Sequence, residues 1–299
     1  MAIGTERNQI LQSIIPQLAP QVTRTGDLWN LNCHRVYCGD ARNDGAYSAL
    51  MQGQCAKAVF SAPPHNDLVD SYVGGVGQAP VPGFPKAING PEFASFLTVV
   101  LKLFARHSAD GAWHFIWMDW IHTPELLAGA QQAYTEFMDL CIWVKEVARQ
   151  GSPYRNQHEL VFVFKSGKGA QHSNTRPGQF CRNRSNVWKY RSVNSCARSS
   201  DENNLSDPHS TIKPVELIAD AILDCTAHGE VVLDAFSGSG TTVIAGERTG
   251  RVCYGIELNP HNVDTIVRRW QDFTGQNAIQ ESTGRTFNEI EEENYGRAK

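Results

Sequence analysis

Several features that would assign this chain to a well-known class are missing from its sequence. None of its eight cysteines forms a CxxC pair, so the sequence indicates neither a zinc site nor a disulfide framework. No apolar run approaches the roughly 18 residues that a membrane span requires. The N-terminus also lacks the charged-then-apolar order of a signal peptide. We therefore expect a cytoplasmic protein with reduced cysteines, no metal and no membrane contact.

An overall excess of positive charge is missing as well. The formal net charge is -4, so any surface for a polyanion must be local. One window, Lys165–Ser200, carries eight cations, no acidic residue, and interleaved Asn, Ser and aromatic side chains. Such a run is either a solvated loop or a surface that contacts phosphates, and the interleaved donors favour phosphate contact.

The pattern of the 299 residues indicates an α/β fold with a mostly parallel sheet, because apolar strands alternate with amphipathic helices. Long Gly- and Pro-rich stretches are confined to residues 70–90, where we expect a loop. The expected strands are 34–41, 55–64, 111–120, 140–146, 158–167 and two within 230–258. The expected helices are 92–107, 124–138, 213–229, one within 230–258, and 262–275.

The sequence "VVLDAFSGSGTT" predicts a strand, a tight turn and a helix. Gly238 and Gly240 would let the backbone approach a ligand at the helix N-terminus. Glu257 ends the next strand, where a carboxylate can accept hydrogen bonds from ribose hydroxyls. A turn that binds no ligand is the plainer alternative. A nicotinamide oxidoreductase is disfavoured, because the third glycine of G-x-G-x-x-G is missing.

A second stretch, "VFSAPPHND" at 59–67, reads as a buried strand that opens onto a rigid loop. Its two prolines are flanked by Ala62 and His65. Such loops present side chains to a ligand, and an ordinary turn is the alternative.

Together these two motifs resemble the beta class of S-adenosylmethionine-dependent DNA amino-methyltransferases, which modify adenine N6 or cytosine N4. "LDAFSGSGTT" is similar to the cofactor motif D-P-F-x-G-S-G-T-T, and "SAPPH" is similar to the catalytic loop [DNS]-P-P-[YFW]. The catalytic loop comes first and a basic segment separates the two, which is the order of that class. The similarity extends from about Gly26 to Ile279 and includes "CGDA", "YRNQHELVFVFKSG" and "HSTIKPVELI".

The resemblance implies a Rossmann-like methyltransferase fold with a mostly parallel sheet flanked by helices. It divides the chain into a lead-in (1–30), a methyltransferase domain (31–279) with an inserted basic DNA-recognition segment (165–210), and a flexible tail (280–299). The partner would be double-stranded DNA, and a homodimer is compatible with the class.

The resemblance also implies the site residues. Contacts to S-adenosylmethionine would come from Asp40, Ala41, Thr211, Lys213, Asp234, Phe236, Ser237, Gly238, Gly240, Thr241 and Glu257. The catalytic loop would be Ala62, Pro63, Pro64 and His65. Contacts to DNA would come from Arg155, His158, Lys168, Arg176, Arg182, Arg184, Lys189 and Arg191, although Arg155 and His158 could equally brace the sheet. Ala235 replaces the usual proline, which removes no ligand.

The loop departs from the family at the two positions that handle the flipped base. Ala62 stands where an acceptor for the amino group is expected, and His65 where an aromatic ring should stack. One lost transition-state hydrogen bond typically costs about 2.7–4 kcal/mol. Ser61 or Asp67 could act as a substitute acceptor. The sequence therefore predicts a methyltransferase, most simply for adenine N6, and its alternative is a pseudoenzyme that binds DNA and cofactor.

Overall fold

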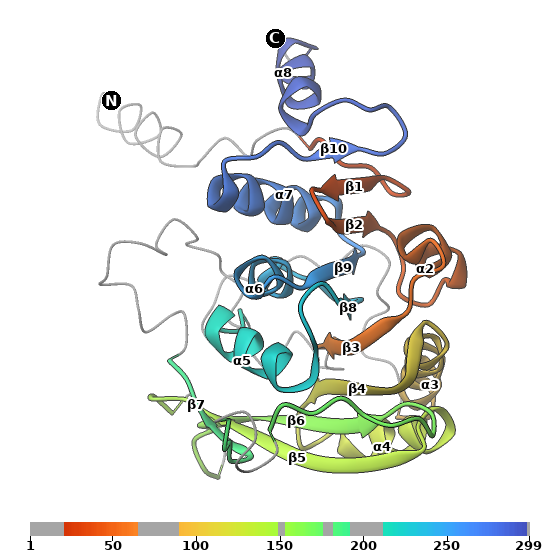
Figure 1. The fold of residues 1–299 in the computed structure, drawn as a ribbon, viewed down its shortest axis with the longest axis vertical. Coiled ribbons are helices and arrows are strands. Elements are labelled where there is room, and N and C mark those ends of the chain that lie inside the picture. The colour runs from red at the N-terminus through yellow and green to blue at the C-terminus, as the bar shows by residue number, and fades with distance from the viewer. Residues whose placement is uncertain (1–20, 65–89, 149–152, 176–181, 192–211, 298–299) are drawn as a thin grey trace, which may run out of the picture.

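The computed structural model describes residues 21–64, 90–148, 153–175, 182–191 and 212–297. The strands that it describes form one ten-stranded sheet, with helices on both faces (Figure 1). The order of the strands across the sheet is β10-β1-β2-β9-β8-β3-β4-β6-β5-β7. This arrangement confirms the α/β prediction with a mostly parallel sheet.

The elements follow the expected alternation along most of the chain. The strands are β1 (Leu28–Leu31), β2 (His34–Cys38), β3 (Ala56–Ser61), β4 (Ser108–Met118), β5 (Glu136–Val144), β6 (His158–Lys165), β7 (Val187–Lys189), β8 (Val231–Asp234), β9 (Val252–Glu257) and β10 (Ile279–Gln280). The helices are α2 (Asp44–Met51), α3 (Gly90–Arg106), α4 (Thr123–Ala133), α5 (Val215–Cys225), α6 (Thr241–Thr249), α7 (Pro260–Thr274) and α8 (Phe287–Arg297).

The middle of the sheet consists of five parallel strands, β2, β9, β8, β3 and β4. Their carboxyl ends therefore meet at one edge of the sheet, which we call the carboxyl edge. On one side β4 pairs with β6 and β6 with β5, both antiparallel. The amino end of β6 and the carboxyl end of β5 consequently lie at the same carboxyl edge. In parallel α/β sheets this edge is where ligands bind.

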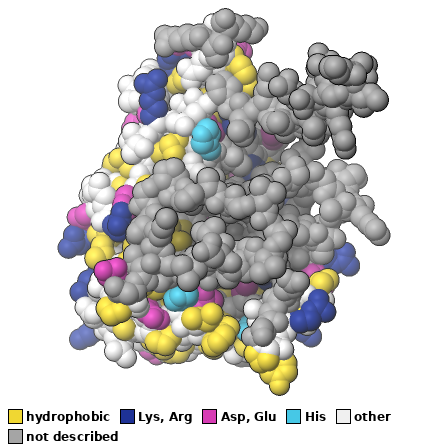
Figure 2. Space-filling view, turned by 180° about the vertical axis from the view of Figure 1, so that it is seen from behind, with side chains coloured by type: hydrophobic (Ala, Val, Ile, Leu, Met, Phe, Trp, Pro, Cys, Tyr) yellow, Lys and Arg dark blue, Asp and Glu magenta, His cyan; other side chains and the backbone are white. Residues whose placement is uncertain are grey.

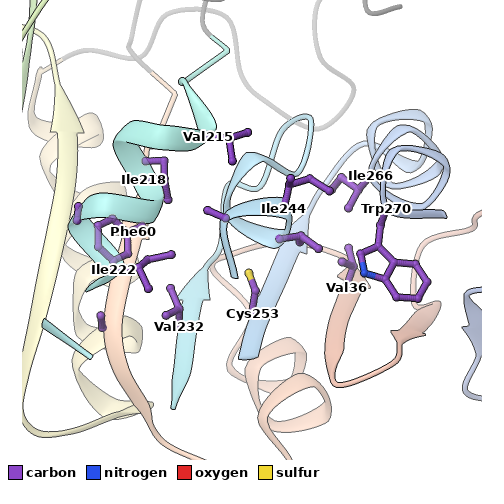
Figure 3. Packing of buried hydrophobic residues seen from close by; sticks show 14 of the residues in the cluster. Val36, Phe60, Val215, Ile218, Ile222, Val232, Ile244, Cys253, Ile266 and Trp270 are labelled. Atoms are coloured by element: carbon purple, nitrogen blue, oxygen red, sulfur yellow. The ribbon is translucent and has the colours of Figure 1, made fainter. Parts of the chain in front are cut away.

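Two hydrophobic clusters, one on each face, hold the sheet between its helices. One cluster joins the inner sides of α5, α6 and α7 to the sheet, and Figure 3 shows Ile218, Ile244 and Ile266 converging on the strands from these three helices. The other cluster contains side chains of α2, α3 and α4. The apolar residues of these helices recur at helical spacing, which is why the sequence predicts most of them.

Helix α7 shows how the local sequence sets an element that supports the site. Asn259 caps its start by accepting a hydrogen bond from the backbone N–H of His261, and Pro260 occupies the first turn. The helix ends at Gly275, whose φ of 70° is left-handed. Its buried side chains include Ile266 and Trp270. The predicted helix over 262–275 is thereby confirmed.

The two ends of the described chain differ from the sequence prediction. The predicted lead-in contains β1, which pairs with β2 through a turn in which Asn32 has a φ of 55°. The predicted flexible tail is wrong over most of 280–299. There β10 ends at Gln280 beside β1, and α8 follows it. The buried Phe287 packs edge-on against Trp29 at 5.2 Å, and Ile290 packs against the same cluster, so two apolar side chains anchor an otherwise polar helix.

Two further boundaries also differ. The helix predicted over 124–138 ends at Ala133, because Tyr134 turns to extended backbone and β5 begins at Glu136. The predicted basic DNA-recognition segment, 165–210, contains the short edge strand β7, which the sequence pattern does not predict and whose Trp188 is buried. Much of the rest of that segment, and the loop predicted over 70–90, lies outside the described residues.

The described helices include none that is long and apolar enough to cross a bilayer. Within the same described ranges, no cluster of three or more His, Cys, Asp or Glu side chains could hold a metal ion.

Candidate active site

The residues predicted from the two motifs come together at the carboxyl edge of the sheet. Asp234 is the last residue of β8 and Glu257 the last of β9, and these strands are parallel neighbours. On the other side β8 pairs with β3, which ends at Ser61 and leads directly into Ala62 and the two prolines. β3, which leads into the predicted catalytic loop, and β8, which leads into the predicted cofactor turn, therefore lie side by side.

The Gly-rich turn after β8 depends on its glycines for different reasons. Gly238 has a φ of 53°, and a Cβ there would meet nothing within 4 Å, so this position is open to a ligand. Gly240 has a φ of 79°, and a Cβ there would lie 2.8 Å from Ile266 of α7. The absent side chains thus allow a ligand to approach at one position and a helix at the other.

Asp234 is a buried carboxylate that is oriented by three donors. The Thr242 hydroxyl donates to it at 2.6 Å, the Phe236 backbone N–H at 3.1 Å and the Ser61 hydroxyl at 3.3 Å. Burial raises the pKa of Asp234 to about 6 despite these donors. No Lys or Arg of the described residues forms an ion pair with it. A bound cation would therefore relieve the cost of its buried charge.

Glu257 fastens the turn from the neighbouring strand. Its carboxylate accepts hydrogen bonds from the Gly238 N–H at 2.8 Å, the Asn259 N–H at 2.9 Å and the Asn262 side-chain amide at 3.2 Å. The side chain is buried at the end of β9, one strand away from Asp234. A carboxylate at this position is both a structural brace for the turn and an acceptor beside the open face of Gly238.

The other side chains predicted from this turn point into the protein or toward its helices. Ser237 is buried, and its hydroxyl donates to the Asp234 carbonyl. Thr241 is buried, with the Arg269 guanidinium 3.4 Å from its hydroxyl. The Phe236 ring lies 6.2 Å from the ring of Phe96 on α3. These three side chains shape the turn, and any ligand contact from them stays a prediction.

Asp40 and Ala41 follow β2 and so reach the same edge. The Asp40 carboxylate forms a salt bridge with Arg42. Burial raises the pKa of Asp40, but Arg42 outweighs that effect and the net shift is downward, so this carboxylate stays ionised. Ala41 is buried and its carbonyl accepts from the Tyr47 hydroxyl.

Only part of the predicted catalytic loop lies within the described residues. Ala62 is half-buried against the core, Pro63 is buried and Pro64 is half-buried, whereas His65 and Asp67 lie outside the described range. The Ser61 side chain is buried and donates to Asp234. The hydroxyl proton of Ser61 is thus directed toward Asp234 at the end of β8.

Lys213, predicted as a cofactor contact, forms an ion pair that joins the segment just before α5 to strand β6. Its Nζ lies 2.9 Å from a carboxylate oxygen of Glu159 on β6, and Lys145 pairs with the other oxygen of Glu159 at 2.5 Å. Burial opposes ionisation of Glu159, but the two lysines outweigh it and hold its pKa at about 2. Thr211 lies outside the described residues.

Two of the predicted DNA-binding residues form ion pairs within the chain. Arg182 and Arg184 both reach the carboxylates of Asp220 and Asp224 on α5, at distances of 2.8–3.3 Å. The Arg184 guanidinium also lies over the rings of Trp188 and Tyr190. These contacts fasten the basic segment to α5, so the structure gives both arginines an internal role that the sequence prediction does not include.

The remaining predicted DNA contacts divide between two edges of the sheet. Lys189 and Arg191 are exposed at the carboxyl end of β7, which runs parallel to β5. His158, exposed at the start of β6, and Arg155 just before it reach the same edge. Lys168 follows β6 at the opposite edge and is not brought to the site. Arg176 lies outside the described residues.

Figure 2 shows the face opposite to that of Figure 1. The Lys and Arg side chains coloured there are spread around the margin and form no single patch.

The sequence prediction missed two residues that support the site, Thr242 and Gly255. Thr242 donates to Asp234, as does Ser61, which the sequence suggested only as a substitute acceptor. Gly255 in β9 makes room for the turn, because a Cβ there would lie 2.5 Å from the Ser237 hydroxyl. The second threonine of "GTT" and the glycine of "YGIEL" were visible in the sequence, but their contacts cross between elements.

Type II methyltransferases are among the known proteins to which the chain is similar. Over 109 residues the chain is 32% identical to the type II methyltransferase M.HpaI of Haemophilus parainfluenzae, covering 36% of this chain and 33% of that protein. Over 139 residues it is 35% identical to M.Cfr9I of Citrobacter freundii, covering 44% of this chain and 43% of that protein. The matched region thus spans less than half the length of these curated relatives.

Solved structures share the fold. PvuII DNA methyltransferase, which is cytosine-N4-specific, has a TM-score of 0.61 at 15% identity, covering 88% of this chain and 91% of that one. M1.HpyAVI, solved as a complex with SAM, has a TM-score of 0.54 at 17% identity, covering 78% of this chain and 98% of that one. At these identities the likeness establishes a Rossmann-like methyltransferase fold.

A family model described as DNA methylase, of the N6/N4 type, matches residues 57–268, which is more than two thirds of the chain. This range begins in β3 before the two prolines, contains the Gly-rich turn and ends within α7. The chain therefore belongs to the N6/N4 DNA methylase family.

Proposed function

We propose that this chain transfers a methyl group from S-adenosylmethionine to the exocyclic amino group of a base in double-stranded DNA. The observation that carries the proposal is the hydrogen bond between Ser61 and Asp234. It joins the end of the proline-containing catalytic strand to the carboxylate that begins the Gly-rich turn. A cofactor held at the turn and a base held at the prolines would thereby be neighbours.

The residues of the pocket suit a cationic nucleoside. Asp234 is buried with a raised pKa and no cationic partner among the described side chains, so the positive sulfonium and amino groups of the cofactor would offset its charge. Glu257 stands where ribose hydroxyls can reach a carboxylate. The open face of Gly238 leaves room between the two. The cofactor supplies an activated methyl group, and the protein positions it.

The chain's own residues would then orient the target amino group. Its lone pair is delocalised into the ring, so an acceptor that draws on the N–H bonds helps the in-line displacement. The Pro63 carbonyl is the acceptor that remains, because Ala62 supplies none. We propose that turnover is slower than in relatives that carry an acidic or amide side chain at position 62.

Adenine N6 is the target base that we propose. The support is the resemblance of the motifs and their order to a subgroup that is usually adenine-directed. We also propose that the methyltransferase unit predicted over 31–279 is completed by β1 and α8, which lie at its two ends in the sequence and pack together, and that the basic segment 165–210 reads the DNA. Lys189 and Arg191 are its best-placed cations among those described, because both are exposed at the carboxyl edge.

Calorimetry with S-adenosylmethionine tests the cofactor part of this proposal. The parent protein should bind it, and Glu257→Ala should weaken binding by about 1–3 kcal/mol, because the ribose hydroxyls lose their acceptor. Asn262→Ala is the matched control, since it removes a donor to Glu257 without removing the carboxylate. The proposal fails if the parent does not bind, or if Glu257→Ala binds as tightly as the parent.

A further inference from the structure

A tryptophan stands exposed immediately after β4. The side chain of Trp120 is 64% exposed and that of the next residue, Ile121, is 55% exposed. The preceding residues, Trp117 and Met118, are almost completely buried. A large aromatic ring left in water forgoes a substantial hydrophobic gain, and exposed aromatic residues commonly mark a binding surface.

The position of Trp120 relative to the catalytic loop follows from strand pairing. β3 and β4 are parallel neighbours, and Ser61 is paired with Ile116 near their carboxyl ends. The chain leaves β3 through Ala62, Pro63 and Pro64, and it leaves β4 two residues before Trp120. Both exits open from adjacent strands at the same edge. The indole therefore belongs to the rim beside the loop that would hold the base.

The turn that carries Trp120 is held in place from both sides. The Asp119 carboxylate accepts from the His122 backbone N–H at 2.7 Å and pairs with the His122 ring nitrogen at 2.9 Å. The Thr123 hydroxyl donates to the Asp119 carbonyl at 3.1 Å. The His122 ring also packs edge-on against Phe93 at 5.2 Å. Trp120 and Ile121 form the tip of this braced turn.

We propose that Trp120 provides the aromatic surface on which the target base stacks after it leaves the duplex. This inference rests on the proposed function. The catalytic loop carries a histidine at the position where relatives of this kind stack an aromatic ring on the base. An indole in the turn after the adjacent strand offers a larger π surface, and every base has a face that can stack on it. The stacking ring would then come from the turn after β4. The Pro63 carbonyl would still accept a hydrogen bond from the amino group of the base.

The matched control is another exposed aromatic residue, at the opposite edge. Phe273 lies in the last turn of α7, is 45% exposed and touches the Arg248 guanidinium. α7 begins directly after the carboxyl end of β9, so its last turn lies away from that edge. Phe273→Ala thus removes a comparable exposed ring without touching the rim.

The experiment compares Trp120→Ala, Trp120→Phe and Phe273→Ala on short unmethylated genomic duplexes in which a fluorescent adenine analogue replaces some adenines. We expect Trp120→Ala to lower kcat/KM for methyl transfer by about 10- to 100-fold, as for the loss of a base–aromatic stack. It should also abolish the fluorescence change that accompanies base extrusion. Cofactor affinity and melting temperature should stay at parent values. Trp120→Phe should restore most of the rate, and Phe273→Ala should match the parent in all four measurements.

Three results would overturn this assignment. If Trp120→Ala transfers methyl groups and extrudes the base as the parent does, the indole does not stack on the target. If Trp120→Phe is as impaired as Trp120→Ala, the position does not act through an aromatic face. If the parent neither binds duplex DNA nor cofactor, the proposed function fails and this inference fails with it. The first two results leave the proposed function standing.

Discussion

The Ser61 hydroxyl donates a hydrogen bond to a carboxylate oxygen of Asp234 at 3.3 Å, across the pair of strands β3 and β8. Both side chains are buried. Their contact connects the strand that enters the proline loop with the strand that begins the Gly-rich turn. The position of one motif is thereby set by the position of the other.

Replacing Ser61 with alanine tests that connection. We expect Ser61→Ala to lower the free energy of unfolding by about 1 kcal/mol, because a buried carboxylate loses a donor. The pKa of Asp234 should rise further, since the lost hydrogen bond favours the charged form. Chemical denaturation and a carboxyl NMR titration measure the two effects. A fall in methyl transfer of 100-fold or more with both quantities unchanged would instead make Ser61 the substitute acceptor.

Asp234 should make stability depend on pH with a defined sign. Its pKa is raised from 3.8 to about 6 in the folded protein. Between these values the folded state binds more protons than the unfolded state, so stability without cofactor should fall as the pH rises to about 6. Above that, Asp234→Asn should be more stable than the parent by up to about 3 kcal/mol.

Thermal melts at a series of pH values test this sign. The advantage of Asp234→Asn should shrink as the pH falls toward 4 and be lost below about pH 3, where the carboxyl is protonated in both states. Saturating S-adenosylmethionine should raise the melting temperature of the parent above pH 6 and that of the variant much less. An advantage that persists unchanged down to pH 4 would mean that ionisation of Asp234 carries no cost in the folded protein.

Substitutions should divide the cations of the basic segment into two groups, those that stabilise the fold and those that contact DNA. Arg182→Ala with Arg184→Ala should reduce the free energy of unfolding by about 1–3 kcal/mol, because the Asp224 carboxylate is left buried with fewer partners. Lys189→Ala with Arg191→Ala should leave stability near that of the parent. The latter pair should lower the salt slope of duplex binding by about one unit per lost phosphate contact.

Fluorescence anisotropy over a range of salt concentrations gives the slopes, and denaturation gives the stabilities. The assignment reverses if the Arg182 and Arg184 double variant keeps its stability and loses slope. If neither double variant alters the slope, the DNA-contacting cations lie elsewhere in the chain.

A single substitution at position 62 of the catalytic loop, which lacks a hydrogen-bond acceptor, should raise the rate of methyl transfer. Ala62→Asp adds a carboxylate next to Pro63 and should raise the rate of methyl transfer by about 100-fold, the reverse of losing one transition-state hydrogen bond. His65→Tyr should add little if the Trp120 indole already stacks on the base. A large gain from His65→Tyr alone would favour the loop residue over Trp120. Single-turnover kinetics with saturating cofactor measure both.

Local patterns predicted much of this structure because their contacts are close in sequence. The strand, turn and helix around Gly238 follow from residues within a dozen positions. The helix over 92–107 follows from apolar spacing alone. The end of β4 at Met118 was harder to predict, because "FIWMDW" continues its apolar character to Trp120. Only the strand boundary makes that tryptophan an exposed residue of the rim.

What could not be predicted depends on contacts between distant segments. The pairing of Arg182 and Arg184 with carboxylates about 40 residues away leaves no periodic signal, so the cations look free in the sequence. α8 was missed because its composition is polar and its main apolar anchor, Phe287, packs on a strand at the other end of the chain. Long-range packing of this kind overrides local composition.

The most direct test of the whole account is transfer of tritium from labelled S-adenosylmethionine to unmethylated genomic DNA by the unaltered chain. Nucleoside mass spectrometry of the same DNA then names the base. The account predicts slow but measurable incorporation, found as N6-methyladenine, and a rate that Ala62→Asp increases. N4-methylcytosine would correct the target base and keep the reaction. Binding of both DNA and cofactor with no incorporation, in the parent and in Ala62→Asp alike, would contradict the account.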